Sequence, residues 1–218
     1  MSVIIAIAGG SCSGKTTLAR HLQRRLGSDE AMLIRQDDYY FDIRERAALR
    51  ARDGGGGMPN FDVPEALDFA LLADNLERLK SGEAVSLPNY DFTTHQRVPA
   101  TQPLAAKRFI IVEGLLLLND PAIRQKADVR IYMRCPYALR FQRRMARDIA
   151  ERGRSEAFVN RQFAQDVEPA HIKYIQPSKA HADIVLEQED YMQSIDSVME
   201  RIIDAIPTDA LAGFGIDK

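Results

Sequence analysis

The sequence lacks tryptophan and has only two cysteines, Cys12 and Cys135, among its 218 residues. Two thiols do not form the disulfide framework of a small secreted domain, and neither has the spacing of a metal-binding pair. Long apolar runs are also missing, since the stretch FIIVEGLLLL is interrupted by Glu113 and is shorter than the roughly 20 residues that cross a bilayer. The apolar N-terminus lacks the charged segment of a signal peptide. These absences predict a cytoplasmic protein without a membrane partner.

Charge of one sign is not in excess either. The chain has 29 basic and 31 acidic residues, a net charge of −2 and a pI of about 6.1. This balance provides no global positive field, so no nucleic-acid partner is expected. Hydrophobic residues make up 45%, which is ordinary for a globular protein. The length suits one domain over residues 1–207, followed by a flexible tail at residues 208–218.

Short β-rich runs alternate with segments of helical periodicity, which is typical of βαβ units in a parallel sheet flanked by helices. Strands are predicted at residues 3–8, 32–36, 109–112, 129–133 and 182–186. Helices are predicted at residues 14–26, 44–52, 64–80 and 191–206, from 136 to near 153, and from about 156. A glycine-rich loop is expected at residues 53–59 and an irregular, proline-containing segment at 85–103.

The segment GGSCSGKT, residues 9–16, has the spacing G-x-x-x-x-G-K-[ST] between a predicted buried strand and a helix. Its glycines let the backbone approach a phosphate, and its N–H groups and helix dipole favour an anion. Lys15 is expected to reach the terminal phosphates and the Thr16 hydroxyl to bind Mg²⁺. The pattern predicts a nucleoside triphosphate site, and it does not separate kinases from switches or motors. The predicted phosphate-binding residues are Gly9, Gly10, Ser11, Cys12, Ser13, Gly14, Lys15, Thr16 and Thr17.

Three acids follow predicted strands: Asp37 and Asp38 after the second, and Glu113 after residues 109–112. In open α/β sheets, ligands bind at the carboxyl ends of the strands. Phosphoryl transfer needs Mg²⁺ and an acid that orients or deprotonates the acceptor. A solvated turn would also explain Asp37 and Asp38, and a surface turn would explain Glu113. A role near the bound Mg²⁺ explains Glu113 better, because this acid directly follows four residues that are predicted to be buried and precedes a glycine. The chain contains no Asn-Lys-x-Asp segment, which argues against a GTPase switch.

An arginine-rich helix supplies candidate cations. Arg140, Arg144 and Arg147 share one face by their spacing, and Arg152 and Arg154 flank Gly153. One interpretation is a solvated face in which each i,i+4 ion pair contributes only about 0.3–0.5 kcal/mol. The other is a lid that closes on phosphates and shields the transfer from water. The helix alone leaves both interpretations open.

Several separated motifs together resemble those of the uridine kinases (uridine–cytidine kinases), in the group that contains phosphoribulokinase and pantothenate kinase. In order, the motifs are GGSCSGKTT, QDDYY, NFDVPEALD, PNYDFTTHQR, VEGLL, RRMARDIAERGR and PSKAHADIV. They extend from about residue 3 to residue 186, and PNYDFTTHQR points to the nucleoside kinases within the group. The resemblance implies one P-loop NTPase-type kinase domain with a parallel sheet flanked by helices. It also implies a small β-rich, acceptor-binding insertion at about residues 84–104 and an Arg-rich lid at about residues 147–158.

The implied activity is transfer of the γ-phosphate of ATP or GTP to the 5′-hydroxyl of uridine or cytidine, with Mg²⁺, and the implied assembly is a homotetramer. Two alternatives stay open. The first is a kinase of the same group that acts on another nucleoside, a sugar phosphate or pantothenate. The second is a nucleotide-binding regulator without transfer activity.

The resemblance also implies roles for individual residues. Asp37 is the expected catalytic base, acting with Lys15, and Asp62 is expected on the ribose hydroxyls. Tyr90, Phe92 and His95 would form the pyrimidine pocket, since an aromatic face with directional polar groups can read a base. Simple loop packing would also explain these three residues. The complete acceptor set is Tyr40, Asp62, Tyr90, Phe92, His95, Arg144 and Gln162; the lid cations are Arg147, Arg152 and Arg154; the metal side is Thr16, Glu113 and Asp37.

Overall fold

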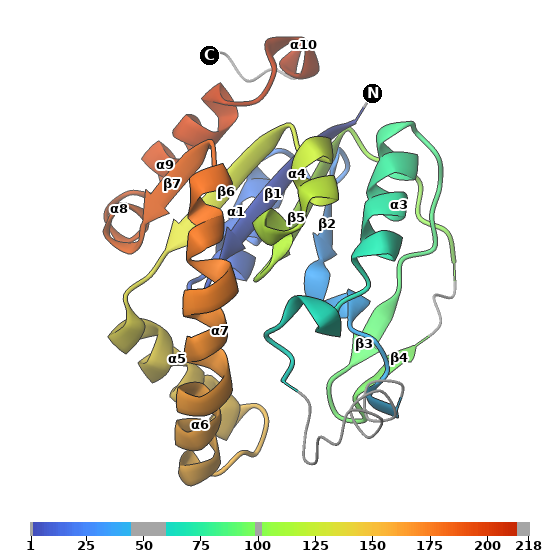
Figure 1. The fold of residues 1–218 in the computed structure, drawn as a ribbon. Helices are drawn as coiled ribbons and strands as arrows, with labels where there is room; N and C mark the ends of the chain where they lie inside the picture. The colour runs from blue at the N-terminus through green and yellow to red at the C-terminus, as the bar shows by residue number, and fades with distance from the viewer. Residues whose placement is uncertain (1, 45–59, 99–101, 213–218) are drawn as a thin grey trace.

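A computed structural model describes residues 2–44, 60–98 and 102–212. Within these residues, five parallel strands form the central sheet in the order β2-β5-β1-β6-β7 (Figure 1). The strands are β1 (Val3–Gly9), β2 (Ala31–Arg35), β5 (Phe109–Gly114), β6 (Val129–Arg134) and β7 (Ile184–Glu187). The predicted fold class is therefore confirmed, and β1 delivers the phosphate loop, residues 9–16, to the middle of the carboxyl edge of the sheet.

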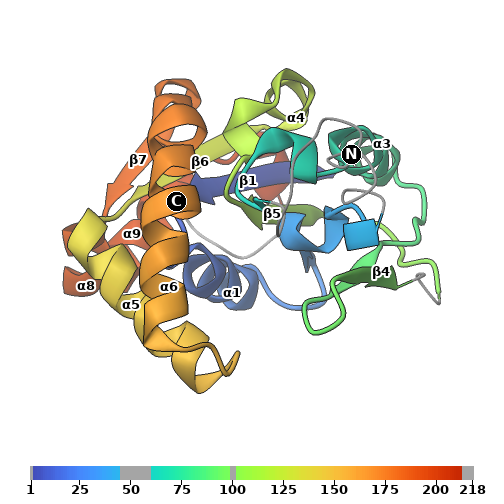
Figure 2. The same ribbon diagram turned by 60° about the horizontal axis from the view of Figure 1, so that its bottom comes forward.

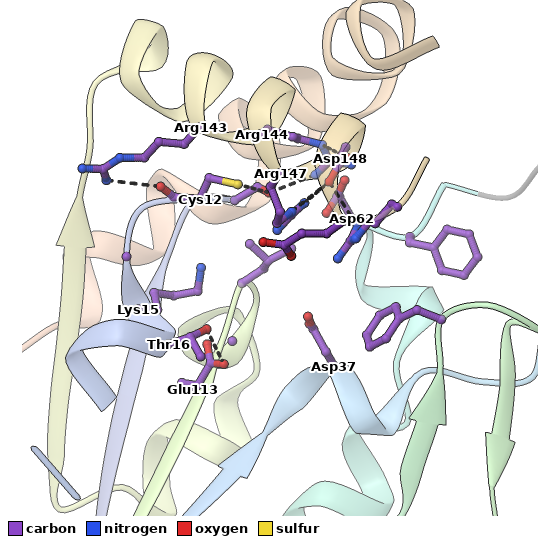
Figure 3. Close-up of a pocket in the computed structure, with 18 of the residues that line it drawn as sticks. Cys12, Lys15, Thr16, Asp37, Asp62, Glu113, Arg143, Arg144, Arg147 and Asp148 are labelled. Carbon is purple, nitrogen blue, oxygen red and sulfur yellow. Dashed lines mark hydrogen bonds and ion pairs between the residues drawn. The ribbon is translucent and has the colours of Figure 1, made fainter. Parts of the chain in front are cut away.

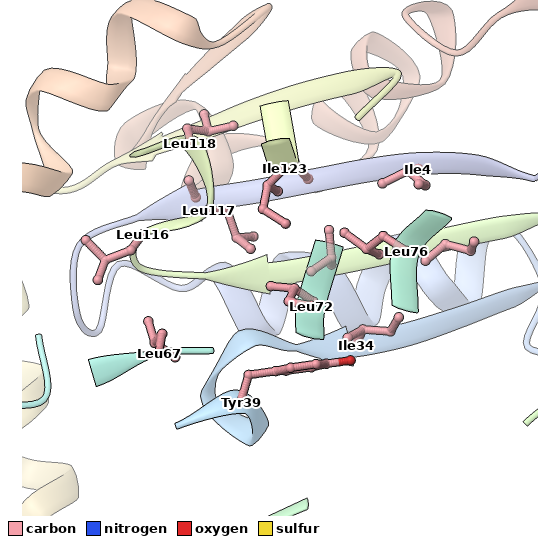
Figure 4. Packing of buried hydrophobic residues seen from close by; sticks show 14 of the residues in the cluster. Ile4, Ile34, Tyr39, Leu67, Leu72, Leu76, Leu116, Leu117, Leu118 and Ile123 are labelled. Atoms are coloured by element: carbon pink, nitrogen blue, oxygen red, sulfur yellow. The ribbon is translucent and has the colours of Figure 1, made fainter. Parts of the chain in front are cut away.

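The two faces of the sheet build two apolar cores, because alternate side chains of a strand point to opposite faces. Ile4, Ala6 and Ala8 of β1 belong to one core, and the intervening residues belong to the other. Helices α3 (Phe69–Lys80) and α4 (Pro121–Lys126) supply Leu72, Leu76 and Ile123 to the first core (Figure 4). Helices α1 (Lys15–Arg25) and α9 (Ile195–Asp204) supply Leu18, Leu22, Val198 and Ile202 to the second.

Side-chain caps account for helix starts that differ from prediction. The helix expected from residue 64 begins at Phe69, where the Asp68 carboxylate accepts the backbone N–H of Leu71 at 3.0 Å. Pro64–Ala66 forms a separate 3-10 turn, η2. The helix expected at residues 191–206 is two helices, α8 (Gln188–Gln193) and α9, because Ser194 caps the second one. Helix α4, which was not predicted, starts after the capping residue Asp120.

The arginine-rich segment folds back on itself. Helix α5 (Tyr137–Ala150) is followed by Gly153 in the left-handed region, with φ 61°, and by α6 (Glu156–Gln162). The two helices lie side by side (Figures 1 and 2). We call α5, α6 and their connection the lid. Beyond α6 the helical path continues through η4 (Phe163–Val167), α7 (Glu168–Ala170), η5 (His171–Ile175) and η6 (Pro177–His181), of which η4 and η5 are π-helical.

The predicted β-rich insertion is an antiparallel hairpin of β3 (Asn89–Asp91) and β4 (Gln96–Val98), which we call the β3–β4 hairpin. Arg97 fastens the hairpin to the turn that follows β2. The guanidinium of Arg97 donates to the backbone carbonyls of Tyr39 at 3.0 Å and Tyr40 at 3.2 Å. It also pairs with the carboxylate of Asp68 at 3.1 Å.

The prediction of a loose tail from residue 208 is wrong for its first residues. Thr208–Leu211 forms α10, and Leu211 is buried in the second core. The sequence signal is weak because a single leucine anchors the turn. Residues 213–218, the predicted loop at 53–59 and nearly all of the helix predicted at 44–52 lie outside the described residues. Among the helices described, none is long and apolar enough to span a bilayer.

Candidate active site

A cavity of about 870 Å³ lies at the carboxyl ends of the strands, between the lid and the β3–β4 hairpin (Figure 3). It brings together most of the predicted site residues, from segments far apart in the chain. Those that line it are Ser11, Cys12, Gly14, Lys15, Thr16, Thr17, Asp37, Tyr40, Asp62, Phe92, His95, Glu113, Arg144, Arg147, Arg152, Arg154 and Gln162. Gly9, Gly10, Ser13 and Tyr90 do not line it.

Close packing fixes the phosphate loop. A Cβ atom at Gly9 would lie 2.4 Å from the backbone oxygen of Met133, and Gly14 adopts a φ of 97°, so both positions require glycine. The Lys15 ammonium donates to the backbone oxygen of Gly10 at 2.8 Å. Burial lowers the pKa of Lys15, while Glu113 and Asp37 oppose this shift. A cation is thus held in place beside two carboxylates.

The side of the phosphate loop that faces away from the cavity packs against two buried side chains, Arg140 and His171. A Cβ atom at Gly10 would lie 2.8 Å from Cδ of Arg140 and 3.0 Å from the His171 ring. Arg140 is only 2% exposed and pairs with Glu168 at 2.8 Å. Burial, followed by the charge of Arg140, lowers the pKa of His171 to about 4. Arg140 therefore supports the loop from below and does not share the cavity with Arg144 and Arg147.

Thr16 and Glu113 meet at the carboxyl ends of the inner strands, where the Thr16 hydroxyl donates to Oε1 of Glu113 at 2.8 Å. Burial raises the pKa of Glu113, and Lys15 opposes this shift. A hydroxyl and a carboxylate are hard oxygen ligands of the kind that Mg²⁺ prefers. In the part of the chain that the structure describes, no group of three or more His, Cys, Asp or Glu residues could hold a metal by itself. Mg²⁺ commonly uses one or two carboxylates and completes its shell with phosphates and water, so this donor set fits it.

The adjacent acids after β2 point in different directions because Gln36–Tyr39 forms a 3-10 turn, η1. Asp37 projects into the cavity (Figure 3). Asp38 accepts from Arg35 at 2.7 and 2.9 Å and from the backbone N–H of Tyr90 at 3.4 Å. Burial raises the pKa of Asp38, and Arg35 opposes the shift. Asp38 therefore ties the turn to the β3–β4 hairpin, while Asp37 faces the cavity.

Aromatic rings form the wall on the hairpin side. Phe61, which was not predicted, stacks on His95 with 5.1 Å between ring centroids, and it meets Tyr40 edge-on at 5.6 Å. Tyr90 is 3% exposed and packs behind Tyr40 and Phe92, at 5.4 and 5.2 Å. The position of Tyr90 does not support the predicted contact with a base. The aromatic residue next to Asp62 in NFD was the available signal for Phe61.

Two polar side chains, Asp62 and His95, lie beside these aromatic rings. Burial raises the pKa of Asp62, and Arg144 opposes the shift. His95 has a positive φ of 55°, and burial, then Arg154 and Arg152, lower its pKa. Nδ1 of His95 has no hydrogen-bond partner among the described residues. The site thus offers a carboxyl group and an imidazole with a free nitrogen beside aromatic surfaces.

The lid covers the cavity with guanidinium groups. Arg144 is 7% exposed and donates to the Ser11 hydroxyl at 2.9 Å and to Oε1 of Gln162 at 3.0 Å. The solvated-face interpretation is therefore wrong for Arg144. Arg147 contacts Asp148 at 2.8 Å, although its i+4 neighbour is Glu151. The i,i+4 pair of Arg144 with Asp148, which the solvated-face interpretation included, forms at 3.3 Å, but it is buried.

The end of the cavity near α8 was also missed. Arg143 donates to Oε1 of Gln188 at 2.9 Å and to the backbone oxygen of Cys12 at 3.5 Å. Gln188 and Tyr191 line the cavity with it. These residues are far from the phosphate loop in the sequence and belong to no local motif, so their place beside the loop could not be predicted.

Comparisons with known proteins agree with this geometry. The sequence model of the "Phosphoribulokinase / Uridine kinase family" matches residues 4–193 of the chain. The chain is 43% identical over 188 residues to uridine kinases of Shewanella sp. (strain ANA-3) and Shewanella baltica (strain OS185), covering 84% of this chain and 86% of each relative.

Solved structures share the fold. A Silicibacter sp. protein described as a fructose transport system kinase has a TM-score of 0.69 at 23% identity, covering 85% of this chain and 89% of its own. Phosphoribulokinase from Rhodobacter spheroides has a TM-score of 0.60 at 20% identity, covering 85% of this chain and 70% of its own. The order of strands, the phosphate loop and the sequence match together place the chain in the phosphoribulokinase/uridine kinase family.

Proposed function

We propose that the protein is a nucleoside kinase that transfers the γ-phosphate of ATP to the 5′-hydroxyl of uridine or cytidine. One observation supports the proposal: Asp37 projects into a single cavity that is lined both by the phosphate loop, which we call the phosphate half, and by Phe61, Phe92 and His95, which we call the aromatic half. Relatives of 43% identity that are uridine kinases support the choice of acceptor.

The phosphate half suits a nucleoside triphosphate. The backbone of the phosphate loop and Lys15 would bind the β- and γ-phosphates, and Arg147, Arg152 and Arg154 would approach them from the lid. Thr16, Glu113 and Asp37 would hold Mg²⁺, which when bound would offset negative charge on the phosphate oxygens. The cations concentrate where charge spreads over the transferring group, which is where electrostatic stabilisation lowers the barrier.

The aromatic half suits a pyrimidine nucleoside. The carboxylate of Asp62 would accept both ribose hydroxyls, and Phe61, Phe92 and His95 would enclose the base. In this pose the 5′-oxygen attacks the γ-phosphorus, Asp37 accepts the hydroxyl proton, and ADP leaves. Arg144 and Gln162, joined at 3.0 Å, would contact the acceptor from the lid side.

A panel of acceptors with labelled ATP tests the proposal. We expect labelled UMP and CMP, and little transfer to pantothenate or sugar phosphates. Turnover on a non-nucleoside without turnover on uridine or cytidine would reject the acceptor and favour another kinase of the group. Nucleotide binding without acceptor-dependent ADP release would favour the regulator.

Three finer points follow from the family resemblance and are proposed with it. GTP would also serve as donor, the chain would assemble as a homotetramer, and the enzyme would work in the cytoplasm in pyrimidine salvage. Donor competition assays and sedimentation equilibrium check the first two points. A monomer at micromolar concentration would contradict the second.

A further inference from the structure

Asp148 is an unusual feature of the lid, because its carboxylate is buried in a wall made of cations. Its side chain is 3% exposed and lines the cavity. Three guanidinium groups approach it: Arg144 at 3.3 Å, Arg147 at 2.8 Å and Arg152 at 3.5 Å. A buried carboxylate is costly unless it is paired, so these contacts are what keeps Asp148 in this place.

We propose that Asp148 is a positioning residue that holds the lid arginines in the orientation needed by the transferring phosphoryl group. The proposal rests on the proposed function, in which Arg147 and Arg152 bind phosphate and Arg144 contacts the acceptor. Asp148 itself does not touch the reacting atoms. It acts through Arg144, Arg147 and Arg152, which come from both sides of it in the chain.

The directions of the three arginines support this role. Arg144 reaches the Ser11 hydroxyl of the phosphate loop at 2.9 Å while it pairs with Asp148. Arg152 lies over the Phe92 ring, 5.6 Å from its centroid, while it pairs with the same carboxylate. One acid therefore links cations that touch the phosphate half and the aromatic half of the cavity.

The charge balance at Asp148 leaves the wall positive. Three guanidinium groups surround one carboxylate, so an excess of positive charge faces the space where a triphosphate would bind. Nε and Nη2 of Arg147 both approach Oδ1 of Asp148 at 2.8 Å. Because a guanidinium has five N–H donors, Arg147 keeps donors for a ligand after both contacts. Asp148 thus orients the cations without neutralising them.

A merely structural role predicts something different. If Asp148 only relieved repulsion among arginines, its loss would lower stability and weaken nucleotide binding and turnover together. If Asp148 orients the arginines, its neutral isostere would bind ATP at least as well, because a negative charge is removed from the site. Turnover would fall, since the cations no longer match the transition state.

The test compares Asp148→Asn with Glu156→Gln, which removes one negative charge from an exposed position at the start of α6. We expect Asp148→Asn to lower kcat by about tenfold or more, with the Kd for ATP unchanged or smaller. Glu156→Gln should match the wild type in both. Asp148→Glu, which keeps the charge, should recover part of kcat. Parallel loss of kcat and ATP affinity, or an unchanged kcat, would overturn the proposal.

A binding cycle makes the test independent of the acceptor. Arg152→Gln should weaken ATP binding by a larger factor in the wild type than in the Asp148→Asn background, because only a positioned arginine contributes fully. Equal factors would overturn the positioning role. An inactive wild type with unequal factors would reject the acceptor assignment and retain the role of Asp148.

Discussion

The two halves of the cavity are built by different means. Backbone groups and buried residues build the phosphate half: Gly9 admits no side chain, and Lys15 is 7% exposed. Side chains from separate loops build the aromatic half, where Phe61 stacks on His95 and both line the cavity. The comparison indicates that the phosphate half is fixed by the fold, whereas the aromatic half depends on which side chains the loops carry.

A mutation of Asp37, which lies where the two halves meet, should lower turnover without weakening the binding of either substrate. Asp37→Asn removes the proton acceptor while keeping its shape, so kcat should fall by about 10²–10⁴-fold. The Kd for ATP, measured by titration calorimetry, should stay within about threefold. Asp38→Asn is the matched control, because Asp38 pairs with Arg35 and not with the cavity. If Asp38→Asn is the more damaging change, the two roles are reversed.

A change confined to the acceptor half should leave ATP binding intact. Asp62→Asn should raise the KM for uridine by about 10–100-fold, the range for losing one partner of a buried, charged hydrogen bond. Burial raises the pKa of Asp62, so acceptor affinity should fall, as the pH drops, at a higher pH than for an exposed aspartate. Asp62→Asn should abolish this part of the pH profile, and the exposed Asp204→Asn should preserve it. An unchanged KM would remove Asp62 from the acceptor site.

A change confined to the phosphate half should act through the fold. A Cβ atom at Gly114 would lie 2.3 Å from the side chain of Gln36, which is fully buried. Gly114→Ala should therefore lower the free energy of unfolding by about 1–3 kcal/mol, seen as a lower thermal midpoint. In a Gln36→Gly background the same change should cost less, because Cβ, Cδ and Oε1 of Gln36, which the new methyl group would meet, are all absent. An equal cost in both backgrounds would show that the packing is looser than described.

The smallest effect is expected at His95. His95→Ala should raise the KM for uridine by roughly tenfold, since one polar contact to the base is lost. The thermal midpoint should change less than for Gly114→Ala, because His95 is only half-buried and its removal introduces no clash. A steady-state assay together with a melting curve checks both expectations. Loss of stability without a change in KM would assign His95 to packing.

The candidate residues of the phosphate half could be located from the sequence, because most of them are consecutive. The loop, Lys15 and Thr16 follow from one local pattern, and Glu113 follows from its place after a buried strand. Helix α4 was missed although Asp120 followed by Pro121 is a usual helix start. Its six residues are too few for a visible apolar period.

The rest of the site depends on tertiary packing. The spacing of the arginines placed Arg140 with Arg144, but the fold buries Arg140 under the phosphate loop beside His171. Tyr90 belongs to the motif that resembles the family, yet it packs behind the cavity wall. The contact of Arg143 with Gln188 joins residues 45 positions apart. Such pairings depend on how the helices pack against the sheet, which periodicity does not reveal.

Arg97 has a consequence for how the site moves. Its guanidinium binds the carbonyls of Tyr39 and Tyr40 and the carboxylate of Asp68, so the hairpin that carries Phe92 is anchored to the turn that carries Asp37. Asp37 and the rings of Phe92 and His95 therefore belong to one rigid unit with the sheet. We expect substrate-driven closure to involve the connection around Gly153 and α6, while the hairpin and α5, which Arg144 ties to Ser11, stay still.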